Sequence, residues 1–163
     1  MKTILTNILE RITEKIPTLK YVDENWGQLD YFSPSHPVKY PCALADIDNV
    51  QWDDLGNHCQ TGVAQIRITV ANLKLGNTSN AAPAAQRQKA FQIVDLMADL
   101  HRALHGWKPA ENAGNLTRNA IRIVQREDGI KQYEILFDLQ IADESAKPIR
   151  IPVKNVGLVI NTP

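Results

Sequence analysis

Residues 83–107, PAAQRQKAFQIVDLMADLHRALHGW, form a long segment with the apolar periodicity of an amphipathic helix. Pro83 suits the start of a helix and Gly106 its end. At 100° per residue the apolar arc holds Ala90, Ile93, Val94, Leu96, Met97, Leu100 and Leu104, and the opposite face holds Gln88, Gln92, Asp95, Asp99 and Arg102. The segment therefore predicts a helix with one side in the core.

Phe91 and Ala98 fall between these two arcs, nearer the polar boundary. An aromatic side chain in that position has no obvious place in the core of a monomer. We expect a partner to cover it.

The rest of the chain predicts a second helix and several strands. Apolar residues recur at helical spacing over residues 2–16, and Pro17 stops the run. Asp128-Gly129 is typical of a tight hairpin between two strands. Residues 48–61 are polar and rich in turn formers, so they predict a long surface connection. The expected strands are 19–22, 28–32, 40–47, 62–72, 120–127 and 130–141.

This order of elements predicts an α+β fold with a largely antiparallel sheet and two helices packed on one face. We expect one domain over residues 1–163, since the chain has 163 residues and shows no internal repeat. Alternation at Ile149, Ile151 and Val153 is typical of a strand, but Pro148 and Pro152 exclude a central one. Residues 148–163 are therefore expected to form an edge strand or an extended C-terminal arm.

Composition narrows the function classes. Lys plus Arg and Asp plus Glu both number 18, so the net charge of zero disfavours sequence-specific nucleic-acid binding. Two cysteines cannot form a disulfide framework. Polar residues interrupt the N-terminal apolar run, which predicts neither a signal peptide nor a membrane span. We expect a soluble protein made in the cytoplasm.

The candidate reactive residues form no recognisable site. His101 and His105 have the spacing of two metal ligands, but Arg102 stands where a zinc protease helix has its glutamate. His58 and Cys59 match no ligand or nucleophile pattern. The aspartates at 46, 48, 53 and 54 lack the spacing of a calcium loop. The sequence predicts no enzyme, no metal and no cofactor.

Several segments together resemble the tail-terminator, or tail-completion, proteins of long-tailed bacteriophages and related minor tail proteins. The resemblance covers most of the chain. It rests on the N-terminal helix, on residues 40–47 (YPCALADI), 65–71 and 100–107 (LHRALHGW), and on Leu116-Thr117-Arg118 with Tyr133-Glu134-Ile135.

The resemblance implies a homo-oligomeric ring, commonly a hexamer, on the end of the tail tube. Such a ring stops tube growth and presents a surface to the head, so the tail tube protein and the head–tail connector proteins are the implied partners. No residue would act in catalysis. The protein would lie in the host cytoplasm during assembly and then in the virion tail, in an active phage or a prophage.

A ring of this kind needs head-to-tail contacts, so each copy uses two different patches. Phe91 with Ala98 is our candidate for one patch. The loop 74–82 or the C-terminal arm could supply the other, which adds Leu73, Leu75, Ile151 and Val153 to the candidate interface residues. Leu73 and Leu75 could equally pack under their own loop.

Three alternative functions remain open from sequence. The first is another minor tail or neck protein of similar fold. The second is a small metal-dependent hydrolase that uses His101 and His105 or the aspartates. The third is a monomeric binding module of cellular origin.

Overall fold

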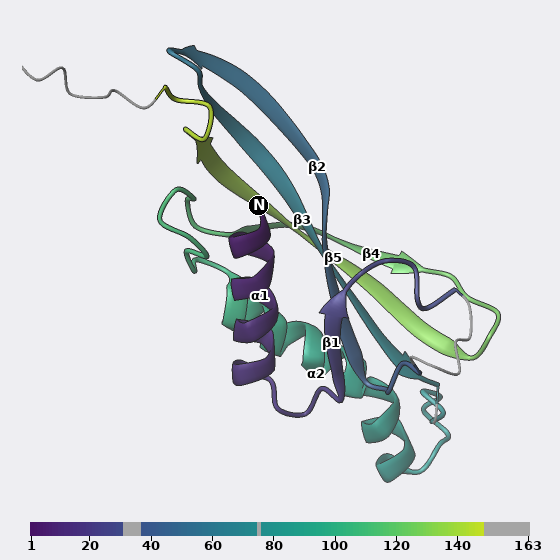
Figure 1. Cartoon of the computed structure of the whole chain (residues 1–163). Coiled ribbons are helices and arrows are strands. Elements are labelled where there is room, and N and C mark those ends of the chain that lie inside the picture. Colours follow the sequence, from purple (N-terminus) through teal and green to yellow (C-terminus); the bar gives the residue numbers. More distant parts are fainter. Residues whose placement is uncertain (31–36, 75, 149–163) are drawn as a thin grey trace, which may run out of the picture.

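The computed structural model describes residues 1–30, 37–74 and 76–148. The chain forms two helices and five strands in the order α1, β1, β2, β3, α2, β4, β5 (Figure 1). Their bounds are α1 Lys2–Lys15, β1 Tyr21–Glu24, β2 Cys42–Gly56, β3 Cys59–Leu73, α2 Ala84–Leu104, β4 Thr117–Val124 and β5 Ile130–Asp143.

The five strands make one sheet in the order β1-β2-β3-β5-β4. β1 runs parallel to β2, and the other three pairings are antiparallel. Both helices cover the same face of this sheet (Figure 1). The predicted α+β architecture, with a largely antiparallel sheet and two helices on one face, is confirmed.

The main core lies between the helices and the sheet. α1 contributes Ile4, Ile8 and Ile12, each at most 2% exposed, at the spacing of one helical face. Burying each isoleucine stabilises the fold by about 1.5–3 kcal/mol. From the sheet and α2 the core receives Ala43, Ala45, Ile66, Ile68, Val70, Ile93, Leu96, Leu100, Ile135, Phe137 and Leu139.

Polar contacts join the two helices near the end of α2. Arg11 Nε donates to the carbonyl oxygen of Ala103 at 2.7 Å, and its guanidinium lies 4.7 Å from the ring centroid of Trp107. Trp107 follows Gly106, whose φ of +76° ends the helix as predicted. These contacts hold α1 alongside α2.

The prediction of a long surface connection at residues 48–61 is wrong. β2 and β3 pair along almost their whole length and meet at a two-residue turn, where Asn57 and His58 have φ of 52° and 61°. With the end of β5 they project beyond the helices (Figure 1). No helix covers this part, most of its side chains meet water, and its polar sequence lacks strand alternation. We call residues 50–63 and 140–148 the sheet extension.

The first predicted strands shift or disappear. The strand expected at 19–22 is β1, Tyr21–Glu24. No strand forms at residues 28–30. Instead the N–H of Asp30 donates to the carbonyl oxygen of Gly27 in a turn, and Gly27 has a φ of +92°. The side chain of Gln28 closes this turn, accepting from the N–H of Trp26 at 2.9 Å. Residues 31 and 32 of that expected strand lie outside the described residues.

The β4–β5 hairpin has a longer loop than Asp128-Gly129 predicts. β4 ends at Val124, and residues 125–129 connect it to β5. Arg126 leaves the ladder because its guanidinium binds Asp30, Asp128 and the carbonyl oxygen of Leu29. This guanidinium ties the loop to Leu29 and Asp30.

The second face of the sheet is partly covered as well, which the prediction of a single covered face missed. A small cluster there joins Leu29, Cys42, Leu44 and Ala71, with Val38 and Tyr40 packed against it. The segment around residues 37–41 thus shields one part of this face. Of the edge strand or arm expected at residues 148–163, all but Pro148 lies outside the described residues.

Neither helix within the described ranges is long and apolar enough to cross a membrane.

Candidate assembly surface

α2 exposes an apolar row on the side away from its core face. Phe91 is 49% exposed and Val94 is 44% exposed, and Ala98 lies one turn further along. Spacings of three and four residues place all three on one helical stripe. The predicted exposure of Phe91 and Ala98 is confirmed. The assignment of Val94 to the buried arc is wrong, because that arc is narrower than the projection implied.

β4 exposes a second apolar row. Ile121 is 45% exposed and Ile123 is 65% exposed. They pair with Ile135 and Tyr133, whose side chains face the helices, so both isoleucines stand on the helix side of the sheet. β4 is an edge strand, and neither of these side chains is covered from the outside. This row was not among the predicted interface residues, although strand alternation at Ile121 and Ile123 marks it.

The C-terminal end of α2 lies next to β4, and the part of α2 around Ala90 lies next to β5. The backbone N–H of Arg118 on β4 donates to Nδ1 of His105, just past α2, at 3.1 Å. At the other end, Lys131 Nζ on β5 donates to the carbonyl oxygen of Ala90 at 3.1 Å. The two rows therefore flank one side of the molecule. We call Phe91, Val94, Ala98, Ile121 and Ile123 the α2–β4 surface.

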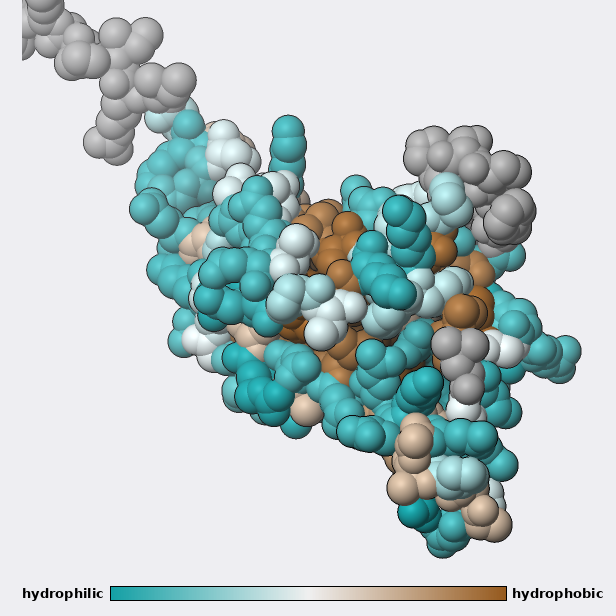
Figure 2. Space-filling view, turned by 90° about the horizontal axis from the view of Figure 1, so that it is seen from below, coloured by the Kyte–Doolittle hydropathy of each residue, from teal (hydrophilic) through white to brown (hydrophobic). Residues whose placement is uncertain are grey.

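A view of the molecule from below shows hydrophobic side chains at the surface. They gather in the middle of this face and again on its right, among hydrophilic side chains (Figure 2). The left of the view, where the strands project, is mostly hydrophilic (Figure 2). Apolar exposure on this face is thus clustered, which is typical of surfaces that meet a partner.

The other candidate interface residues do not join the α2–β4 surface. Leu73 is 41% exposed, but it follows Ala71 by two residues and pairs with Ile130, so it faces the opposite side of the sheet. Leu75, Ile151 and Val153 lie outside the described residues. Leu73 thus lies apart from Phe91. The interface roles of Leu73, Leu75, Ile151 and Val153 stay predictions.

His101 and His105 stack with their ring centroids 4.7 Å apart. Nδ1 of His105 accepts from Arg118, and Nδ1 of His101 is buried without a hydrogen-bond partner among the described residues. Burial, with the charges of Arg118, His105 and Arg102, lowers the pKa of His101. His101 is therefore half-buried beside the exposed ring of His105, and its surroundings favour the neutral imidazole.

The aspartates separate into two groups. Asp46 and Asp48 both bind Arg67, with Oδ to NH distances of 3.0 Å, across the β2–β3 pairing. Asp53 and Asp54 lie in the sheet extension. Within residues 1–30, 37–74 and 76–148, no three His, Cys, Asp or Glu side chains come together as a metal site requires.

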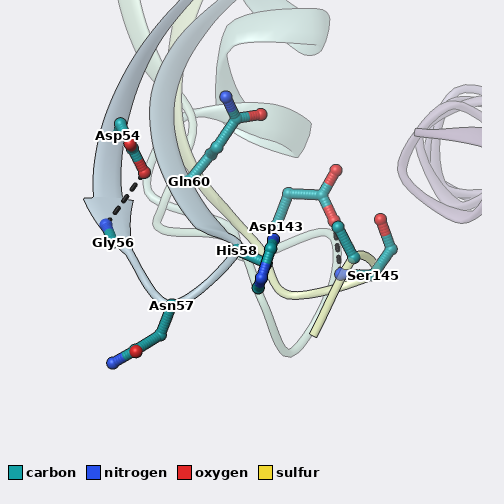
Figure 3. A pocket seen from close by; sticks show the side chains of 8 residues that line it. Asp54, Gly56, Asn57, His58, Gln60, Asp143 and Ser145 are labelled. Carbon is teal, nitrogen blue, oxygen red and sulfur yellow. Dashed lines mark hydrogen bonds between the residues drawn. The ribbon is translucent and has the colours of Figure 1, made fainter. Parts of the chain in front are cut away.

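A hollow of about 610 Å³ lies at the end of the sheet extension (Figure 3). Asp54 accepts from the N–H of Gly56 and Asp143 from the N–H of Ser145, both at 2.8 Å. Each carboxylate thus closes a turn of its own strand, which is a structural role. His58 and Gln60 complete the polar lining (Figure 3).

The cysteines are free thiols in different surroundings. Burial raises the pKa of Cys42 to about 12, so this side chain is an uncharged thiol at neutral pH. Cys59 is half-buried at the start of β3, with Sγ 3.6 Å from the carbonyl oxygen of Asn57. His58 and Cys59 are neighbours at the hairpin turn, where the thiol of Cys59 contacts the carbonyl oxygen of Asn57 and not His58.

Comparison with known proteins adds a structural likeness. No family model and no curated protein matches the chain. Among solved structures, the chain is similar to a chain from the virion of a native gene transfer agent particle, with a TM-score of 0.51 and 14% sequence identity. The match covers 83% of this chain and 92% of the other. The two chains share a fold over most of their lengths.

Proposed function

We propose that this chain is a structural virion protein of the tail-terminator type. Its copies form a ring, commonly a hexamer, on the end of the tail tube, stop tube growth and help join the tail to the head. The tail tube protein and the head–tail connector proteins are its partners. The protein assembles in the host cytoplasm and stays in the virion tail.

One observation carries the proposal: the shared fold with a chain of a gene transfer agent virion, over nearly the full length of that chain. The exposed apolar rows add support, because an assembling subunit must keep surface that another copy can bury. A role elsewhere in the tail or neck fits the same fold and is the second candidate.

A hydrolase function receives less support from the geometry. His101 is packed against His105, Asp46 and Asp48 bind Arg67, and Asp54 and Asp143 close turns. Asp46, Asp48 and Asp54 are thus already engaged in structural contacts.

We place Phe91 and Ala98 in one of the two ring contacts. Phe91→Asp puts a carboxylate on the exposed stripe and should abolish ring formation while the subunit stays folded. Native mass spectrometry and circular dichroism measure the two properties. Lys39→Asp, at an exposed site on another part of the chain, is the matched control. Unchanged assembly of Phe91→Asp would remove Phe91 from the interface.

Electron microscopy of particles made without the protein tests the function itself. Overlong tails, or tails that do not join heads, are the expected result. Tails of normal length that join heads normally would contradict a terminator role. Restoration by the wild-type chain supplied in trans completes the experiment.

A further inference from the structure

We propose that the sheet extension of one copy docks on the α2–β4 surface of the next copy, with acidic residues of the extension against basic residues beside that surface. The inference rests on the proposed function only in that copies of the chain assemble. In this contact the sheet extension is the second patch of the head-to-tail interface. The sequence had predicted the loop 74–82 or the C-terminal arm for that role.

The sheet extension is acidic. Its described residues carry Asp53, Asp54, Asp143 and Glu144 against Lys147 alone, and Lys147 is bound to Glu144 at 3.0 Å. No lysine or arginine of the described ranges lies within ion-pair distance of Asp53 or Asp54. Arg150 and Lys154 follow in the sequence, outside the described residues.

The same extension exposes apolar side chains. Leu55 is 64% exposed and Trp52 is 38% exposed, next to Asp53 and Asp54 in the sequence. Trp52 faces the helix side of the sheet, because it pairs with Gly62 between Ala64 and the turn. Apolar and acidic side chains therefore occur together at the end of the molecule that projects from the helices (Figure 1).

The Phe91 end of the α2–β4 surface has the opposite charge, whereas Asp95 and Asp99 lie beyond Val94 on α2. Residues 73–94 contain Lys74, Arg87 and Lys89 and no Asp or Glu. Arg87 lies on the stripe of Phe91, four residues earlier, and donates to the carbonyl oxygen of Asn80 at 3.2 Å. Lys131 donates to the carbonyl oxygen of Ala90.

Arg87 and Lys131 donate to uncharged carbonyl oxygens, so their positive charges remain available to a partner. Asp95 is the first acidic residue along α2 and lies beyond Val94. The surface thus offers exposed apolar side chains with Arg87 and Lys131 beside them, which complements the composition of the extension.

One copy cannot make this contact with itself. Along β5, Tyr133 lies beside Ile123, while Asp143 lies at the extension. Ten residues of strand separate them, a span of about 33 Å. The two patches are therefore held apart by a continuous strand, and only a second copy can bring them together. A contact between different patches is the type that closes a ring by rotation.

Charge reversal tests the pairing. Asp53→Lys/Asp54→Lys and Arg87→Glu/Lys131→Glu should each weaken association at least about tenfold, because like charges would then face each other. A chain with all four substitutions should regain association, since the pairing is restored with its signs exchanged. Native mass spectrometry at several concentrations measures association, and thermal unfolding checks that each subunit is folded.

Two further variants separate charge from fold. Glu10→Lys/Glu24→Lys changes the net charge equally at exposed sites on α1 and β1 and should assemble like the wild type. Asp53→Asn/Asp54→Asn removes the charge with little change of shape, so that a role in the turn at Gly56 is retained. It should weaken association less than the reversal does.

A cross-link tests proximity directly. Ile123→Cys places a thiol on the α2–β4 surface, while Cys59 is the native thiol of the extension. Oxidation with diamide should give disulfide-linked multimers on a non-reducing gel, and Cys59→Ser should prevent them. Lys39→Cys in place of Ile123→Cys is the control.

The outcomes distinguish the two proposals. A wild-type chain that forms no oligomer in solution and is absent from tails contradicts the proposed function and, with it, this contact. A wild-type chain that assembles while Asp53→Lys/Asp54→Lys assembles equally well contradicts only the contact. Failure of the fourfold variant to recover, when all variants are folded, would also overturn it.

Discussion

Trp52 on β2 lies directly against Gly62 on β3. A Cβ atom at Gly62 would stand 2.9 Å from Cε3 of Trp52 and 2.6 Å from the carbonyl oxygen of Gln51. Real Cβ atoms do not approach so closely, so the absent side chain is what lets the indole rest on the neighbouring strand. This contact shapes the sheet extension, which lies beyond the cover of the helices.

Gly62→Ala should therefore destabilise the protein by about 1–3 kcal/mol, because the added methyl group has no space. Urea unfolding followed by circular dichroism measures this cost. Gly114→Ala is the matched control, since a Cβ there would come no closer than 3.5 Å to other atoms. Equal stabilities of the two variants would show that Trp52 is free to move away.

The two isoleucines that pair across β4 and β5 should respond differently to truncation. Ile135 is 0% exposed, and Ile135→Ala should cost about 2–5 kcal/mol of stability. Ile121→Thr keeps the β-branched shape at an exposed site and should change stability by about 0.5 kcal/mol or less. Chemical denaturation of the unassembled subunit tests both. A large loss for Ile121→Thr would mean that this side chain is covered within one copy.

Arg126 should stabilise the packing of Leu29 on the second face of the sheet. Its side chain is 13% exposed and donates to the carbonyl oxygen of Leu29 at 2.7 Å, as well as to Asp30 and Asp128. Arg126→Ala removes these contacts and should cost about 1.5–3 kcal/mol, the range for hydrogen bonds to a charged group. Thermal unfolding measures it.

Arg87→Ala is the control for Arg126→Ala, since Arg87 donates to the exposed carbonyl oxygen of Asn80 and forms no ion pair with the described residues. Its effect on the stability of the unassembled subunit should be small. Hydrogen exchange should also become faster around Leu29 in Arg126→Ala, because that segment loses its tie to the β4–β5 loop. Unchanged exchange there would contradict this role.

His101 should make stability depend on pH in the mildly acidic range. Burial lowers its pKa in the folded state, so the unfolded state binds the proton more readily. The stabilising contribution of neutral His101 is complete above the unfolded pKa of about 6.5 and decreases as the pH falls below it. Tm should therefore fall more steeply from pH 7 to pH 5 in the wild type than in His101→Gln.

His58→Gln is the matched control for this experiment, because His58 lies exposed at the hairpin turn. It should retain the steep decrease of Tm. If His101→Gln and the wild type showed the same dependence on pH, the titration of His101 would not contribute to stability.

Much of the layered fold could be predicted because it depends on local patterns. Ile4, Ile8 and Ile12 mark the buried face of α1, and Ile66 and Ile68 mark that of β3. Where one side of an element packs on the core and the other meets water, the period of the apolar residues gives the element and its buried side. The helix pair and the antiparallel sheet followed from such segments, and so did the exposure of Phe91.

The hairpin at residues 48–61 could not be predicted in the same way. Its strands are held by pairing with each other and with β5, and the polar residues on both of their faces leave no alternation to detect. Val94 lay within the apolar arc of α2, yet no element covers it. Ile121 and Ile123 show alternation, but only the strand order reveals that they stand at an open edge.

The sequence by itself thus determined which segments are amphipathic, because one-sided burial leaves its period in the chain. Only the tertiary structure decided which apolar rows stay uncovered and which candidates share a side. It placed Leu73 on the side of the sheet opposite the helices and brought β4 beside the C-terminal end of α2. The physical reason is that exposure depends on neighbours distant in sequence, and no local period encodes where a sheet ends.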